Sequence, residues 1–147
     1  MADPFQIVTK YHPFVKYLVD DPVRPSIPAS DRFGDSKLIF ALGEEKPSAI
    51  ICCAFNTNVP EDEQDLFTTS PLVDCNTAVF YTIWSYQSGA GRPMLLEACN
   101  YVLDHLPQIR TFVTLSPKTE MARRFHTSNG AVMFRENTST INYQYQL

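Results

Sequence analysis

The sequence has little that would suit a membrane, a secretion route or a nucleic-acid surface. Its apolar runs are short, as at residues 49–55, whereas a membrane-spanning helix needs ~20 apolar residues. Its first residues lack the basic start and apolar stretch of a secretion signal. The net charge is -4, without the basic stripe that a general nucleic-acid binder carries. We therefore expect a soluble cytoplasmic protein that binds neither nucleic acid nor membrane.

Metal-binding patterns are also missing. The four cysteines contain no Cys-x-x-Cys pair, and the three histidines lack the spacing of a zinc site. We expect no metal, and reduced cysteines that pack as small hydrophobic residues. The acidic run from Glu61 to Asp65 favours a solvated surface turn over a metal site. The cysteines are Cys52, Cys53, Cys75 and Cys99, and the histidines are His12, His105 and His126.

The composition favours one folded domain. The chain has 147 residues, of which 44% are hydrophobic and 19% charged, and this length is typical of a single domain with a substantial core. Residues 1–36 are rich in proline, which breaks both helices and strands. We expect this segment to pack on the domain or to be partly mobile, with a short helix after Pro13. No linker or repeat divides the remainder.

From residue 37 the pattern alternates between strands and helices. We expect strands at 37–42, 48–56, 77–86, 110–115, 131–135 and 140–146, because β-branched and aromatic residues are concentrated there. Between them, apolar residues at helical spacing predict a helix that has Pro93 in its first turn and ends before Pro107. Ser116 followed by Pro117 predicts a second helix start, and Gly130 predicts its end. The result is a mixed α/β (α+β) domain with helices flanking a sheet.

The turn between the strand at 77–86 and the following helix is a candidate phosphate site. Two glycines let the backbone approach a ligand closely, and a helix N-terminus attracts anions. The alternative is a tight turn without a ligand. The candidate binding residues are Gly89, Ala90, Gly91 and Arg92.

Four segments, in the same order along the chain, resemble the C-terminal catalytic domain of malonyl-CoA decarboxylase. They are residues 78–83 (AVFYTI), 106–117 (LPQIRTFVTLSP), 125–132 (FHTSNGAV) and 142–145 (NYQY). A weaker likeness through the His12-Pro13 and Lys46-Pro47 pairs extends it toward the N-terminus. The resemblance implies a GNAT-like fold with a mostly antiparallel sheet. In that fold, the glycine turn takes the pyrophosphate of an acyl-CoA.

The resemblance also implies particular site residues. The family's catalytic histidine corresponds to His126, and its active-site tyrosine corresponds to Tyr143. Thr114 and Ser116 are candidate hydroxyls nearby. A glutamate and a serine of the family's site fall near Thr9 and Leu42, so this chain lacks both.

These observations leave three functions open. The first is decarboxylation of malonyl-CoA to acetyl-CoA by a reduced decarboxylase-like domain. The second is N-acyl transfer from an acyl-CoA, and the third is a CoA-binding or structural domain without catalysis. The resemblance implies an acyl-CoA, malonyl-CoA or acetyl-CoA, as the substrate or ligand, with no covalently bound cofactor. Homo-oligomerisation remains open.

Overall fold

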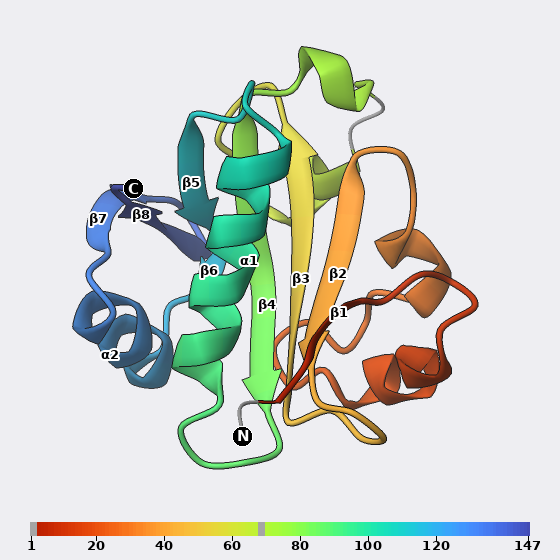
Figure 1. Cartoon of the computed structure of the whole chain (residues 1–147). Coiled ribbons are helices and arrows are strands. Elements are labelled where there is room, and N and C mark those ends of the chain that lie inside the picture. Colours follow the sequence, from red (N-terminus) through yellow and green to blue (C-terminus); the bar gives the residue numbers. More distant parts are fainter. Residues whose placement is uncertain (1–2, 68–69) are drawn as a thin grey trace.

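A computed structural model describes residues 3–67 and 70–147 of the chain, which form a twisted mixed sheet covered on both faces (Figure 1). The strand order is β1-β2-β3-β4-β5-β8-β6, and β7 also pairs with β8. All described pairs are antiparallel except β4 with β5. This confirms the predicted mixed, mostly antiparallel sheet with flanking helices.

The bounds of six strands and of the first α-helix agree closely with the residue patterns, whereas the short strand Phe5–Ile7 was not predicted. The strands are β1 (Phe5–Ile7), β2 (Lys37–Leu42), β3 (Ala49–Asn56), β4 (Thr77–Ser85), β5 (Thr111–Thr114), β6 (Ser116–Pro117), β7 (Val132–Glu136) and β8 (Thr140–Tyr145). The α-helices are α1 (Gly91–His105) and α2 (Glu120–Ser128). The short 3-10 helices are η1 (Pro13–Asp20), η2 (Ala29–Arg32), η3 (Glu63–Phe67) and η4 (Leu72–Asp74).

Two apolar clusters sandwich the sheet. Helix α1 lies across one face (Figure 1) and buries its apolar stripe, including Met94, Leu95 and Val102, against it. The other face is covered by the proline-rich N-terminal segment, from which Phe14 and Leu18 reach the core. Because both faces are covered, every residue of β3 is buried, as expected for a central strand without alternation.

The sheet forks where β4 and β5 part. Their parallel pairing ends at Phe80 with Thr114, whereas β4 continues to Ser85. On its other edge β4 carries a bulge, because Cys52 pairs with Thr82 and Cys53 with Phe80, which leaves Tyr81 as an extra residue. A bulge bends its strand and increases the local twist. The bend therefore turns the second half of β4 away from β5 and β6.

One predicted helix start is wrong. Ser116 and Pro117 form the short strand β6 beside β8, and α2 begins three residues later, after Thr119. The Thr119 hydroxyl accepts a hydrogen bond from the backbone N–H of Ala122 at 3.2 Å, as an N-cap does. Pairing with β8 is a long-range contact that overrides the local Ser-Pro signal. The helix ends as predicted, with Gly130 at φ +98.

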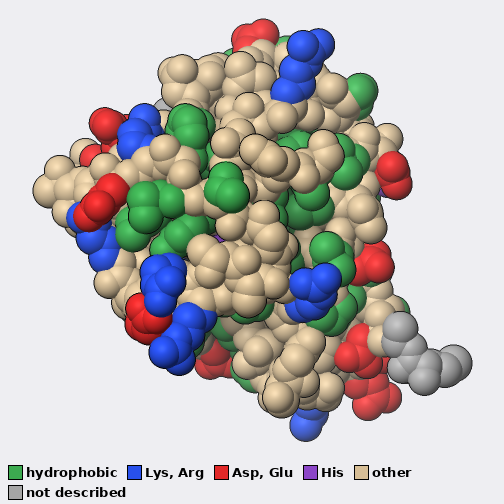
Figure 2. All heavy atoms as spheres, turned by 90° about the vertical axis from the view of Figure 1, so that its left-hand side faces the viewer, with side chains coloured by type: hydrophobic (Ala, Val, Ile, Leu, Met, Phe, Trp, Pro, Cys, Tyr) green, Lys and Arg blue, Asp and Glu red, His purple; other side chains and the backbone are tan. Residues whose placement is uncertain are grey.

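Strand β7 lies at the edge of the sheet next to α2. Its Val132, Met133 and Phe134 are each about half exposed, and Figure 2 shows apolar side chains among charged ones on this side of the molecule. The described cysteines are all buried and free. None of the helices in the described ranges is long and apolar enough to cross a membrane.

Candidate functional site

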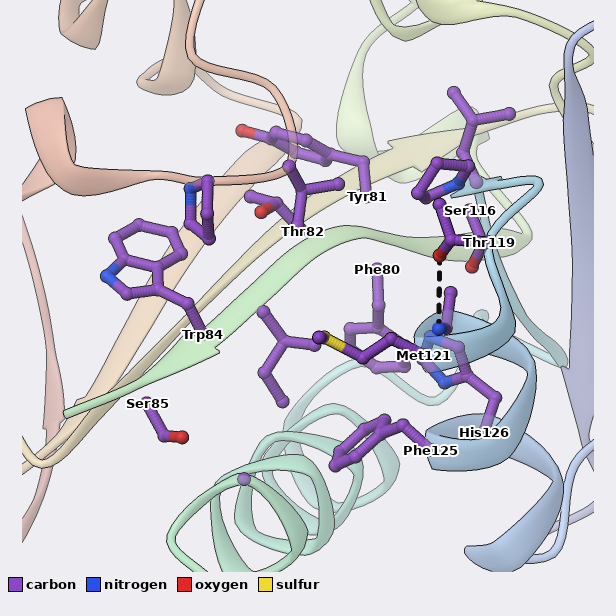
Figure 3. A pocket seen from close by; sticks show the side chains of 17 residues that line it. Phe80, Tyr81, Thr82, Trp84, Ser85, Ser116, Thr119, Met121, Phe125 and His126 are labelled. Carbon is purple, nitrogen blue, oxygen red and sulfur yellow. Dashed lines mark hydrogen bonds between the residues drawn. The ribbon is translucent and has the colours of Figure 1, made fainter. Parts of the chain in front are cut away.

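A cleft of about 340 Å³ occupies the fork of the sheet. The second half of β4 forms one wall, and Leu115, β6 and α2 form the opposite one, with the start of α1 at one end (Figure 3). Pro22 and Val23 of the N-terminal segment reach it from the other face of the sheet. The cleft thus lies between the glycine turn and His126, which are 35 residues or more apart along the chain.

Among the residues that the structure describes, none that lines the cleft is acidic, a lysine or an arginine. Its residues are Pro22, Val23, Phe80, Tyr81, Thr82, Ile83, Trp84, Ser85, Gly91, Leu115, Ser116, Pro117, Thr119, Met121, Ala122, Phe125 and His126. Several of its hydroxyls already have partners within the protein. Thr82 donates to Asp21 at 2.7 Å, and Ser116 donates to Thr114 at 2.8 Å. The imidazole of His126 is therefore the main ionisable group of the cleft.

His126 lies on α2, and its side chain is nearly buried. Only 6% of the residue is exposed, and this burial lowers its pKa from 6.5 to about 4 because the charged ring loses its hydration. Its Nδ1 lies 2.7 Å from the hydroxyl of Tyr145. Its ring also stacks on Tyr143, with the centroids 5.4 Å apart. His126 is consequently neutral at physiological pH.

The hydrogen bond to Tyr145 sets the tautomer of the ring. Burial raises the pKa of Tyr145, so this hydroxyl keeps its proton and needs an acceptor. Nδ1 of His126 is the partner that the structure gives it among the described residues. When Tyr145 donates to Nδ1, the proton of the neutral imidazole resides on Nε2. His126 can then donate a hydrogen bond or a proton from Nε2 into the cleft.

Tyr143 lies behind His126 and does not line the cleft. The residue is 1% exposed, and its hydroxyl is buried without a hydrogen-bond partner in the described structure. Burial raises the pKa of Tyr143. The structure therefore brings Tyr143 and His126 together, as the sequence predicts, but Tyr145 rather than Tyr143 holds the imidazole. The resemblance pointed to this segment through the NYQY motif, in which it implied Tyr143 as the active-site tyrosine.

The glycine turn meets α2 at the end of the cleft. Gly89 has φ +81, a conformation that glycine adopts without strain. Gly91 is the first residue of α1, and a Cβ placed there would lie 2.9 Å from Cε1 of Phe125. Gly91 is the member of the predicted binding set that lines the cleft; Gly89, Ala90 and Arg92 do not. A larger residue at this position would therefore have to displace the ring of Phe125.

The first turn of α1 has donors available for an anion. Ala90, at the N-cap, makes no side-chain capping bond, so no capping side chain occupies the first backbone N–H groups of the helix. Arg92 lies beside them and donates from Nη1 to Oδ1 of Asn129, just after α2, at 2.7 Å. A guanidinium next to uncapped N–H groups suits a phosphate or pyrophosphate.

The remaining candidates have structural roles. Thr114 is fully buried, and its hydroxyl accepts a hydrogen bond from the backbone N–H of Tyr143 at 3.1 Å. Ser116 lines the cleft but donates to Thr114. Thr9 and Leu42 do not line the cleft. Val23 and Met121 do line it, and neither was predicted. Val23 comes from a segment that is distant in the sequence, and Met121 lies on α2 but has no polar group that would mark it as a site residue.

Comparison with known proteins places the fold. The sequence matches no protein-family model and no curated protein. Malonyl-CoA decarboxylase from Rhodopseudomonas palustris superposes with a TM-score of 0.79 and 18% identity, covering 98% of this chain and 60% of that one. The chain thus spans about 60% of that decarboxylase chain.

Two further structures superpose over most or nearly all of their length. The GNAT domain of PAT from S. lividans gives a TM-score of 0.66 at 16% identity, with 97% of this chain and 89% of that chain covered. A Bacillus subtilis acetyltransferase in complex with CoA gives 0.67 at 8% identity, with 100% and 99% covered. The chain therefore has a GNAT-type fold. The likeness to malonyl-CoA decarboxylase, implied by the sequence motifs, is confirmed at the level of the fold.

Proposed function

We propose that the fork cleft binds malonyl-CoA and that the protein decarboxylates it to acetyl-CoA. The observation that carries this proposal is the composition of the cleft: apolar walls without a charged side chain, and one neutral, oriented imidazole. The motifs around His126 and Tyr143 and the fold shared with malonyl-CoA decarboxylase support it.

The ligand is placed by its own chemistry. Coenzyme A carries phosphates at one end and the thioester at the other. The uncapped N-terminus of α1, with Arg92 beside it, suits the pyrophosphate. Beyond the last β5 pair, the edge of β4 that faces the cleft has no strand partner among the described residues. Its backbone groups can therefore hydrogen-bond the amides of the pantetheine arm, which brings the thioester toward His126.

The reaction needs an apolar pocket and a proton donor. When the carboxylate leaves as CO2, the electrons of the broken carbon–carbon bond move into the thioester and form an enolate. A hydrogen bond from Nε2 of His126 stabilises the charge that develops on the enolate oxygen. The imidazole then gives its Nε2 proton to the carbanion carbon, and the imidazolate that this leaves takes up one proton from solvent, which restores the neutral ring. The balance is malonyl-CoA plus one proton giving acetyl-CoA plus CO2.

Burial of His126 fits this role. An imidazolium in the cleft would stabilise the substrate carboxylate and oppose its loss, whereas a neutral imidazole does not. The apolar walls likewise give the carboxylate no ion-pair partner, so the cleft favours the transition state, in which the charge is spread over the thioester.

A second candidate is N-acyl transfer from an acyl-CoA, which the whole-length match to acetyltransferases favours. This reaction needs a base that deprotonates the acceptor amine. No carboxylate lines the cleft among the described residues, so His126 would have to act as this base, in the other tautomer, with its proton on Nδ1 and Nε2 free to accept. Binding of CoA without turnover is the third outcome.

Turnover with malonyl-CoA distinguishes these functions. We expect wild-type protein to release CO2 and form acetyl-CoA, and mass spectrometry of the thioesters measures this conversion. His126→Gln should lower kcat by about 10²- to 10⁴-fold, the usual contribution of a general acid, while CoA affinity stays nearly unchanged. His105→Gln, at an exposed histidine at the end of α1, is the matched control. Acetylation of added amines without CO2 release would instead support acyl transfer, and binding without either reaction would leave only a CoA-binding domain.

A further inference from the structure

The segment Asp21–Arg24 covers the fork from the sheet face opposite α1. Its anchor is the carboxylate of Asp21, which is fully buried and forms an ion pair with Nη1 of Arg32 at 2.6 Å. The other carboxylate oxygen of Asp21 accepts hydrogen bonds from the backbone N–H groups of Val23 and Arg24, at 2.8 and 3.0 Å. The same oxygen also accepts a hydrogen bond from the hydroxyl of Thr82 on β4. The segment is thus fastened to β4 by buried polar contacts.

Arg24 bridges the two strands where they part. Its Nε donates to the carbonyl oxygen of Tyr81 at 3.2 Å, and its Nη2 donates to that of Leu115 at 2.7 Å. These carbonyls belong to the residues that directly follow the last β4–β5 pair. Nη1 of Arg24 forms an ion pair with Glu63 at 3.2 Å. Arg24 therefore ties the two strands together at the base of the fork without itself lining the cleft.

Pro22 and Val23, between these two anchors, line the cleft. With the phosphates at the start of α1, the acyl end of the thioester points away from that helix and toward this wall. We propose that Asp21–Arg24 is the floor of the acyl pocket and that Val23 restricts the substrate to short acyl groups. This inference rests on the proposed binding of acyl-CoA and adds the size of the acyl group.

The polar anchors give this floor its rigidity. A loop without them could shift by an ångström and admit a longer chain, but here Asp21 fixes the backbone of Val23 on one side and Arg24 is tied to both strands on the other. Extra methylenes forced against a fixed apolar wall meet steric repulsion that the anchored segment cannot relieve by moving. A pocket of this kind discriminates about 10- to 200-fold for each extra methylene.

Chain-length dependence of binding tests the inference. Calorimetry with CoA, acetyl-CoA, butanoyl-CoA and octanoyl-CoA avoids decarboxylation, because none of these carries a malonyl carboxylate. We expect wild-type protein to bind acetyl-CoA and to bind octanoyl-CoA at least about tenfold more weakly. Val23→Gly should abolish most of this difference. Val19→Gly, at an exposed position of η1 in the same segment, should leave it unchanged.

The outcomes separate this inference from the function on which it rests. If wild-type protein binds neither CoA nor acetyl-CoA, the proposed function fails and the acyl floor fails with it. If CoA and acetyl-CoA bind but Val23→Gly keeps the wild-type chain-length profile, the floor lies elsewhere and only this inference is overturned. Thermal melting of both glycine variants verifies that they fold. If Val23→Gly is unstable, Val23→Ala takes its place, because alanine gives the loop backbone less freedom than glycine does. Its preference for acetyl-CoA over octanoyl-CoA should be weaker than that of wild-type protein but not abolished.

Discussion

At the residue scale, the properties of His126 come from its burial and its one hydrogen bond. The ring is neutral because its surroundings exclude water, and it is oriented because Tyr145 holds Nδ1 at 2.7 Å. Neither property is visible in the FHTSNGAV motif alone. The motif locates the histidine, and the packing of α2 on β8 determines its protonation.

The lowered pKa of His126 predicts how its contribution to stability changes with pH. The folded protein takes up a proton on His126 only near pH 4, whereas the unfolded chain does so near pH 6.5. The unfolded state therefore binds more protons between these values, and the free energy of unfolding should fall as the pH falls through this window. The full effect is about 3 kcal/mol.

Urea denaturation of wild-type protein and His126→Gln between pH 4 and pH 7 measures this effect. Subtracting the two curves cancels most contributions of other carboxyl groups. We expect the free energy of unfolding of wild-type protein to exceed that of His126→Gln by the largest amount above pH 6.5, and this difference to shrink toward pH 4. A difference that stays constant across the range would contradict a buried neutral histidine.

At the element scale, the site is an arrangement of helix starts and strand ends. The bulge at Tyr81 opens the fork, Gly91 lets α1 approach Phe125 of α2, and β6 replaces what local signals predict as a helix start. Each of these three local features sets the distance between two neighbouring elements of the site.

The start of α1 should carry the electrostatic part of CoA binding. Arg92→Gln removes the cation beside the uncapped N–H groups, and we expect the affinity for CoA to fall about three- to tenfold at low salt. Added salt should weaken binding to the wild-type protein more than to this variant. Arg110→Gln, at an exposed residue just before β5, is the control. If the CoA affinity of wild-type protein and that of Arg92→Gln depended equally on salt, the phosphates would have to bind elsewhere.

The N-terminal segment should depend on its buried ion pair. Arg32→Met leaves the carboxylate of Asp21 buried without its cation, and removing one partner of such a pair costs about 3–5 kcal/mol. By contrast, Arg124→Met breaks the exposed pair of Arg124 with Glu120 and should change the free energy of unfolding very little, because water screens an exposed ion pair. Chemical denaturation compares the two variants. Equal losses would show that the buried pair has no special role.

At the scale of the whole molecule, local patterns predict much of the sheet. Lys37–Leu42 is found as predicted, and β4 and α1 follow from β-branched residues and from apolar residues at helical spacing. What the sequence could not predict are contacts between distant segments. Arg24 bonds to Tyr81 and Leu115 from 57 and 91 residues away, and no local periodicity records such a pairing. The same holds for Tyr145, whose role depends on where α2 packs.

The most direct test of the account is a crystal structure of the protein with acetyl-CoA, which keeps the thioester but has no carboxylate to lose. We predict the pyrophosphate at the first turn of α1, the pantetheine arm along the open edge of β4, and the thioester oxygen about 3 Å from Nε2 of His126. A ligand bound outside the fork, or a thioester beyond reach of His126, would contradict the account.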